Sequence, residues 1–114
     1  MKIAIAGTIT IDADRRQACL TASAPLQAAT RTDEPGCLAY VFTGDLIDPT
    51  TIAVYELWSD PQSLLAHFEH PNYVAMRAMF AEHGIAGAHV MKYRIDAEAM
   101  VYNAQRVASV SFDD

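Results

Sequence analysis

Three side chains able to take part in chemistry lie close together along the chain: Glu56, Trp58 and His67. Trp58 is the only tryptophan, and it stands at the end of a predicted strand, just before a predicted helix. Its indole ring could stack on an aromatic ligand, and its N–H could donate a hydrogen bond to a phenolate. The alternative is a core tryptophan packed under the following helix.

Glu56 precedes Trp58 by two residues, so both side chains share one face of the predicted strand. A partly buried carboxyl group has a raised pKa and could act as a base toward a phenolic hydroxyl. The alternative is a structural ion pair across the sheet with Lys92 or Arg94.

His67 lies on the helix that follows. Leu64, Leu65 and Phe68 centre the apolar stripe of this helix, and His67 is expected on its flank. There a histidine could reach a cleft and exchange a proton near neutral pH; the alternative is a surface histidine that caps or packs. His67 and His70 could form a metal pair, but no third ligand has suitable spacing, so no metal site is expected.

Strand-like alternation precedes this region. It predicts strands over 2–11, 37–46 and 52–59, the last two forming an antiparallel hairpin. Between the first two strands, Asp12 is a candidate N-cap for a helix that begins near Ala13, and Pro25 predicts a kink or break in that helix. The inner stripe of the helix is predicted to be Ala18, Cys19, Ala22, Leu26 and Ala29.

Two further helices and a strand follow the hairpin. Asp60-Pro61 predicts a helix start, and His70-Pro71 predicts the end of that helix and the start of the next. The second of these helices carries Tyr73, Met76 and Phe80 at helical spacing, a pattern typical of core that could also wall an apolar cavity. Gly84 is a candidate C-terminal stop, and alternation over 88–95 predicts a last strand.

The predicted order is that of an α+β, ferredoxin-like βαββ(αα)β domain with a four-stranded antiparallel sheet over residues 1–96. Residues 97–114 form a weakly patterned tail, either a short helix or a strand crossing to a partner. Because every strand carries apolar residues on both faces, the helix-free face is expected to be covered. We therefore expect a homodimer that closes an α+β barrel, sheet against sheet.

Composition narrows the classes of function. The 114 residues carry 8 Lys+Arg against 14 Asp+Glu, a net charge of −6, which disfavours nucleic acid and anionic membrane as partners. No apolar run approaches the roughly 18 residues of a membrane-spanning helix. The first residues are too quickly polar for a signal peptide, so a cytoplasmic location is expected. Cys19 and Cys37 are expected to be reduced thiols.

Three stretches together carry a family resemblance: 34–40 (EPGCLAY), 55–60 (YELWSD) and 67–73 (HFEHPNY). In this order and spacing they resemble the antibiotic biosynthesis monooxygenase family, including its quinol monooxygenase branch, over residues 2 to about 95. The resemblance implies a dimeric α+β barrel. It also implies oxidation of a small phenolic or quinol-type aromatic by O2, with no flavin, haem or metal as cofactor.

The resulting hypothesis assigns roles to eight side chains. His67, or alternatively Glu56, removes the phenolic proton, and Trp58, Tyr40 and Phe68 position the ring. The remaining substrate-binding candidates are Tyr73, Met76 and Phe80. Two other functions stay open: a non-catalytic dimeric barrel that binds a small apolar ligand, and a lactone isomerase or cyclase on the same fold.

Overall fold

The computed structural model describes residues 1–113. The elements are β1 (Ile3–Thr10), α1 (Ala13–Asp33), β2 (Cys37–Gly44), β3 (Thr51–Trp58), α2 (Pro61–Glu69), α3 (Pro71–His83) and β4 (Gly87–Arg94). The order is the predicted one, and no strand boundary differs from its prediction by more than two residues.

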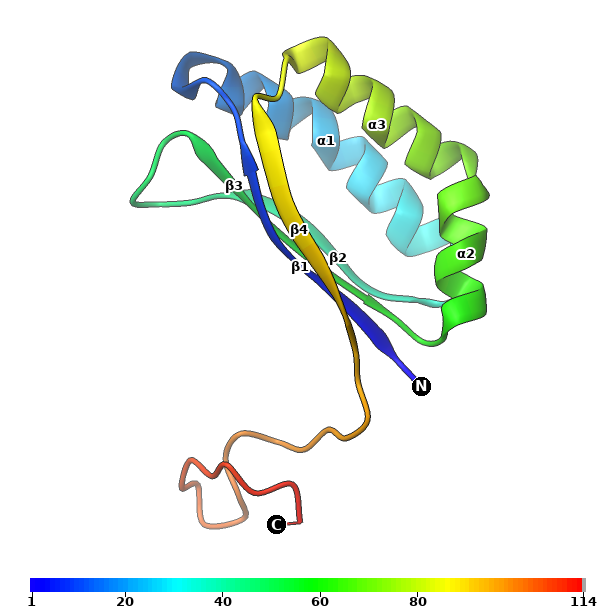
Figure 1. The fold of residues 1–114 in the computed structure, drawn as a ribbon, viewed down its shortest axis with the longest axis vertical. Helices are drawn as coiled ribbons and strands as arrows, with labels where there is room; N and C mark the ends of the chain where they lie inside the picture. The colour runs from blue at the N-terminus through cyan, green and yellow to red at the C-terminus, as the bar shows by residue number, and fades with distance from the viewer. Residues whose placement is uncertain (114) are drawn as a thin grey trace.

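The four strands form one antiparallel sheet in the order β2-β3-β1-β4. All three helices lie on one face of this sheet, and the other face carries no helix (Figure 1). The predicted ferredoxin-like α+β fold is therefore confirmed.

Local sequence signals set the ends of the second and third helices. The Asp60 carboxylate accepts a hydrogen bond from the Ser63 backbone N–H at 2.7 Å, and Pro61 occupies the first turn of α2. His70 separates the two helices, and its ring Nδ1 accepts from the Asn72 N–H at 3.0 Å. Gly84 ends α3 in the left-handed region, with φ of 74°, which glycine adopts without strain.

The first helix departs from its prediction in three ways. The Asp12 side chain makes no capping hydrogen bond, and α1 runs unbroken through Pro25. Proline has no N–H to donate to the carbonyl oxygen of Thr21, four residues earlier. Because Pro25 and Thr21 are both exposed, water can bind this oxygen instead. Of the predicted stripe, Cys19 is buried and Ala22 and Leu26 pack partly buried against the core, whereas Ala18 is exposed; the helix also buries the polar Ser23 and Thr30.

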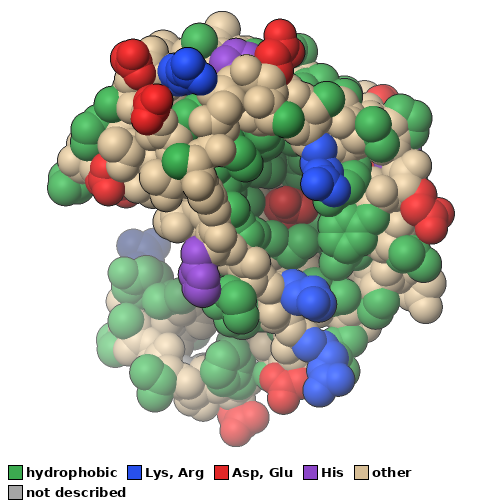
Figure 2. Space-filling view, turned by 45° about the horizontal axis from the view of Figure 1, so that its top comes forward, with side chains coloured by type: hydrophobic (Ala, Val, Ile, Leu, Met, Phe, Trp, Pro, Cys, Tyr) green, Lys and Arg blue, Asp and Glu red, His purple; other side chains and the backbone are tan. Residues whose placement is uncertain are grey.

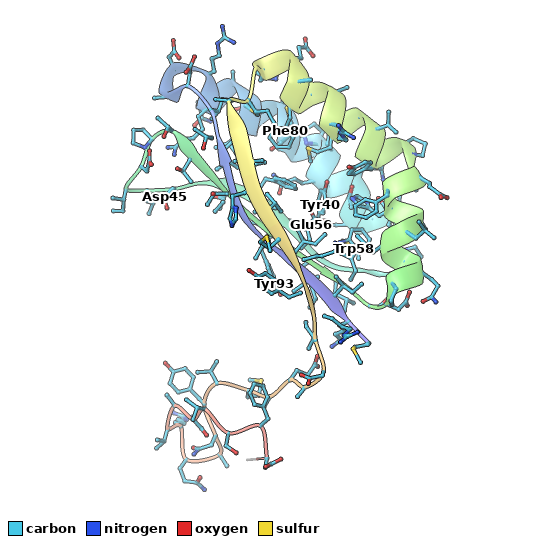
Figure 3. The ribbon with its side chains drawn as sticks, viewed as in Figure 1. Tyr40, Asp45, Glu56, Trp58, Phe80 and Tyr93 are labelled. Atoms are coloured by element: carbon cyan, nitrogen blue, oxygen red, sulfur yellow. The ribbon has the colours of Figure 1, made fainter. Side chains whose placement is uncertain are left out.

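The hydrophobic core lies between the sheet and the helices. Its largest members are Trp58 and Tyr40, at 0% and 1% exposure, from the helix-facing sides of β3 and β2. In Figure 3, Tyr40, Glu56 and Trp58 lie on the helix side of the sheet, whereas Tyr93 points away from it. These inward side chains of β2 and β3 form the floor of the site.

Strand β4 is the least covered element, because all eight of its residues are exposed. It approaches β1 closely at Gly7: a Cβ atom there would lie 2.1 Å from the His89 carbonyl oxygen, so only glycine fits. Beyond β4 the chain runs away from the domain, and a bridge between Tyr102 and Ala108 is its only regular pairing among the described residues (Figure 1). No helix in residues 1–113 has the length and apolar character to cross a membrane.

Candidate functional site

Two adjoining cavities open between the sheet and the helices α2 and α3. The larger, of about 390 Å³, is lined by Ile5, Glu56, Phe68, Tyr73, Val90, Met91 and Lys92. The smaller, of about 220 Å³, is lined by Ile9, Tyr40, Phe42, Val54, Glu56, Tyr73, Met76, Arg77, Phe80 and Val90. They share Glu56, Tyr73 and Val90, and we refer to the pair as the cleft. Figure 2 shows a hollow lined by hydrophobic side chains with an acidic side chain at its bottom.

Glu56 is the only acidic residue that lines the cleft. Its side chain is 8% exposed, and its Oε1 accepts a hydrogen bond from Trp58 Nε1 at 3.0 Å. Burial raises the pKa of Glu56 from 4.5 to about 7, with a smaller contribution from the negative charge of Glu34, and the indole hydrogen bond opposes the rise. A carboxyl group with this pKa can hold or release a proton near neutral pH.

Glu56 makes no ion pair with Lys92 or Arg94, so that structural alternative is wrong. The sheet register explains the result. Glu56 lies opposite Ile5 on β1, and Ile5 lies opposite Lys92 on β4, so β1 separates the two charges. Strand spacing then puts their backbones roughly 10 Å apart.

Trp58 is fully buried and does not line the cleft. Its ring lies 4.4 Å from the His67 ring, centroid to centroid, at an interplanar angle of 33°. Trp58 also borders a separate hollow of about 230 Å³, together with Glu34, Ser63 and His70. Trp58 therefore contacts the cleft only indirectly, through the hydrogen bond from its N–H to the Glu56 carboxylate.

His67 is 1% exposed, so its prediction as a flanking residue of α2 is wrong. The helix buries Leu64 and His67, and it leaves Leu65 and Phe68 60% and 42% exposed. A buried partner explains this rotation, since the His67 Nδ1 lies 2.8 Å from the Glu34 Oε1. Burial lowers the pKa of His67, while the Glu34 hydrogen bond and charge oppose this effect.

Glu34 is the site residue that sequence reasoning missed, because Glu-Pro-Gly is typical of a turn and gives no sign of a buried carboxylate. Its carboxylate is buried and also accepts from Asn72 Nδ2 at 3.2 Å, with His70 Nδ1 at 4.0 Å. The turn is pressed against α2: a Cβ atom on Gly36 would lie 2.1 Å from the Ser63 Oγ. An acidic residue directly before Pro-Gly at a helix end was the available signal.

The structure brings the five predicted substrate-binding residues to the cleft. Phe68 lines the larger cavity, Tyr73 lines both, and Tyr40, Met76 and Phe80 line the smaller one. Burial raises the pKa of the Tyr40 hydroxyl, with the charges of Glu56 and Glu34 adding to the effect, so this side chain stays neutral. Their role toward a substrate remains a prediction.

In residues 1–113, no three His, Cys, Asp or Glu side chains gather in a way that could hold a metal ion. Cys19 and Cys37 are both free thiols, as predicted.

The fold and the cleft define a small α+β domain that presents one buried carboxyl group to an apolar site. The antibiotic biosynthesis monooxygenase family model matches residues 2–79, and the chain belongs to this family.

Solved structures from three bacteria show the same fold. A candidate antibiotic biosynthesis monooxygenase from Deinococcus radiodurans is 20% identical, with a TM-score of 0.77, over 90% of this chain and 100% of that chain. One from Caulobacter crescentus is 22% identical, with a TM-score of 0.75, over 86% and 91%. A Mycobacterium tuberculosis protein is 22% identical, with a TM-score of 0.75, over 88% and 100%.

Among curated proteins, an uncharacterised Synechocystis protein is 29% identical over 69 residues, which is 60% of this chain and 46% of that protein. The matched region thus spans about half the length of this relative.

Proposed function

We propose that this protein is a monooxygenase that oxidises a small phenolic or quinol-type aromatic with O2, using electrons from the substrate itself. The observation that carries the proposal is Glu56, a carboxyl group of pKa about 7 at the bottom of an apolar cleft. A general base is most effective when its pKa lies near the working pH. Family membership supports the reaction class.

In the proposed reaction, Glu56 takes the phenolic proton and leaves an electron-rich phenolate. A ring carbon ortho or para to the phenolate oxygen then transfers electrons to O2 and forms a C–O bond. Loss of water, which carries away the second oxygen atom and two hydrogens, leaves a quinone carbonyl on that carbon. For a naphthol the balance is C10H8O + O2 → C10H6O2 + H2O, and all four electrons come from the substrate.

The neighbouring residues serve this step by position. The Trp58 N–H orients the Glu56 carboxylate and stabilises its ionised form. We assign the base to Glu56 and treat His67 as a positioning residue, since its Nδ1 is engaged by Glu34 and its ring packs on Trp58. The apolar walls of the cleft exclude water from the phenolate and from O2.

A lactone isomerase or cyclase is the second candidate, and the same carboxyl group favours it. Such a reaction needs a proton carrier near neutral pH and consumes no oxygen. O2 dependence therefore separates the two functions.

We further propose that the protein is a homodimer. The helix-free face of the sheet is apolar, with Tyr55, Met91 and Tyr93 45%, 47% and 53% exposed, and Val41 and Leu57 share this face. The tail over 97–113 exposes several large apolar side chains, including Met100, Val110 and Phe112. A second copy would cover both surfaces, with the two sheets face to face and each tail crossing to its partner.

The experiment for the proposed function is dissolved-oxygen uptake in chelator-treated buffer with hydroquinones, naphthols and anthrols. Wild-type protein is compared with Glu56→Gln, which keeps an oxygen to accept from Trp58. Uptake by the wild type that falls at least a hundredfold in the variant supports the proposal. Uptake equal in both proteins contradicts it, and substrate turnover without O2 consumption favours the isomerase.

A further inference from the structure

Four buried side chains make an unbroken series of contacts from the turn after α1 to the bottom of the cleft. The Nδ1–H of His67 donates to the Glu34 Oε1 at 2.8 Å, and the His67 ring packs on the Trp58 ring at 4.4 Å. The Trp58 Nε1–H then donates to the Glu56 Oε1 at 3.0 Å. None of the four side chains is more than 8% exposed. Glu34, which lies outside the cleft, is thereby connected to the acidic side chain inside it.

Aromatic rings fill the space between the two carboxyl groups. Trp58 packs on the face of the His67 ring, and Tyr40 and Tyr73 meet that ring edge to face, with centroids 5.4 and 5.3 Å away. Neither His67 nor Trp58 is more than 1% exposed. Charges that are separated by packed side chains are screened much less than charges separated by solvent. A charge on Glu34 should therefore be felt at Glu56.

The hydrogen bonds around Glu34 are those of an ionised carboxylate. Its Oε1 accepts from the His67 ring, and its Oε2 accepts from Asn72 Nδ2 at 3.2 Å. A negative charge disfavours the ionisation of a second acidic group nearby. The charge of Glu34 accordingly contributes to the raised pKa of Glu56 and to that of the Tyr40 hydroxyl.

We propose that Glu34 is a positioning residue for the base of the cleft: its negative charge, held beyond the His67–Trp58 pair, sets the pH at which Glu56 gives up its proton. The inference rests on the proposed function for the role of Glu56 as a base. It adds a residue outside the cleft that adjusts this base to neutral pH. Without the charge of Glu34, Glu56 would ionise at lower pH and would be a weaker base.

The test is the titration of Glu56 in the full chain, followed by ¹³C NMR of the side-chain carboxyl carbons, in the wild type and in Glu34→Gln. The variant keeps an oxygen that can accept from His67 and removes the charge, so the Glu56 midpoint should move down. We expect a shift of about half a pH unit, because the hollow beside Glu34 lets solvent screen part of its charge. An unchanged midpoint or an upward shift overturns the proposal.

A second variant changes the charge without altering the buried cluster. Ala66 is exposed on α2 and lines the same hollow as Glu34. In Ala66→Lys, the added positive charge opposes that of Glu34, so the Glu56 midpoint should again move down, by less than in Glu34→Gln. An upward shift in Ala66→Lys contradicts the proposal even if Glu34→Gln does not fold.

Two control variants separate the charge of Glu34 from its packing. Asn72→Ala removes a hydrogen-bond donor to Glu34 and leaves the charge in place, so the Glu56 midpoint should not fall. Asp33→Asn removes an exposed charge one residue away and should also leave the midpoint in place. A downward shift in either control equal to that in Glu34→Gln would overturn the assignment. The other ionisable side chains that line the cleft are the same in all these proteins: Tyr40, Tyr73, Arg77 and Lys92.

Oxygen uptake gives a second readout, which a purely structural role of Glu34 would not move. If Glu56 ionises at lower pH in Glu34→Gln, the acid limb of the pH–rate profile moves down with it. At pH 6 the variant should then keep about two to three times more of its maximal rate than the wild type does. An acid limb at the same pH in both proteins would count against the proposal.

The two proposals can fail separately, because the NMR titration needs no substrate. If the Glu56 midpoint falls in Glu34→Gln but the wild type consumes no O2 with any compound of the panel, the coupling stands and the oxygenase proposal fails. If O2 uptake requires Glu56 but the midpoint is the same with and without the charge of Glu34, the oxygenase proposal stands and the coupling fails.

Discussion

Glu34 and Glu56 are both buried carboxyl groups, 7% and 8% exposed, yet their surroundings differ. Glu34 accepts hydrogen bonds from His67 and Asn72 and lies 4.0 Å from His70. Glu56 accepts one hydrogen bond, from Trp58, and otherwise opens onto the cleft. A carboxylate surrounded by donors stabilises a structure, whereas one with a single donor in an apolar site is left available for chemistry.

The largest expected effect is the loss of turnover in Glu56→Gln. The variant removes the proposed base and keeps the acceptor for Trp58 Nε1, so the fold should be retained while oxygen uptake falls 10²- to 10⁴-fold. Glu34→Gln should lose far less activity, since Glu34 does not line the cleft. An equal loss of activity in the two variants would contradict the distinction between the carboxylates.

The effects of these two variants on stability should rank in the opposite order, with Glu34→Gln the more destabilising. Glu34→Gln weakens the charged hydrogen bonds of a buried network and should lower the free energy of unfolding by about 2 kcal/mol. Chemical denaturation at pH 7 measures this change. Glu69→Gln, at an exposed position of α2, is the control and should change stability by less than about 0.5 kcal/mol. Glu56→Gln at pH 7 should be no less stable than the wild type.

The difference in stability between the wild type and Glu56→Gln should depend on pH. The folded-state pKa of Glu56, about 7, lies above the unfolded value near 4.5, so the folded state binds the proton more tightly. The wild type should therefore lose stability relative to Glu56→Gln as pH rises from about 4.5 to 7, by up to about 3 kcal/mol. Parallel stability curves for the two proteins across this range would show that the burial of Glu56 does not perturb its ionisation.

The smallest effect concerns the indole hydrogen bond. Trp58→Phe removes the N–H donor that opposes the rise in the Glu56 pKa, so that pKa should move further upward. The measurement is the pH midpoint of oxygen uptake. Leu46→Phe, at a position 97% exposed in the connection between β2 and β3, is the control and should leave the midpoint in place. A downward shift in Trp58→Phe would show that the indole is not the dominant donor.

Periodicity and capping signals were sufficient to predict the element order, the strand boundaries and the α2–α3 junction at His70-Pro71. They also placed Glu56 and Trp58 on one strand face, because a period of two is a property of any strand. The pairing of His67 with Glu34 could not be predicted, since 33 residues separate them and only the packing of the turn at Gly36 on α2 brings them together. Without that partner, a buried histidine conflicts with the apolar pattern of the helix, and that pattern alone predicts a stripe of Leu64, Leu65 and Phe68, of which only Leu64 is buried.

The most direct test of the central claim is a ¹³C NMR titration of the glutamate side-chain carboxyl carbons, with the Glu56 signal assigned by its absence in Glu56→Gln. It requires no knowledge of the substrate. A Glu56 midpoint near 7, well separated from the ordinary value of 4.5, is the result that this structure predicts. A midpoint near 4.5 would mean that Glu56 is solvated like a surface carboxylate, and the claim that it is the base of the cleft would be contradicted.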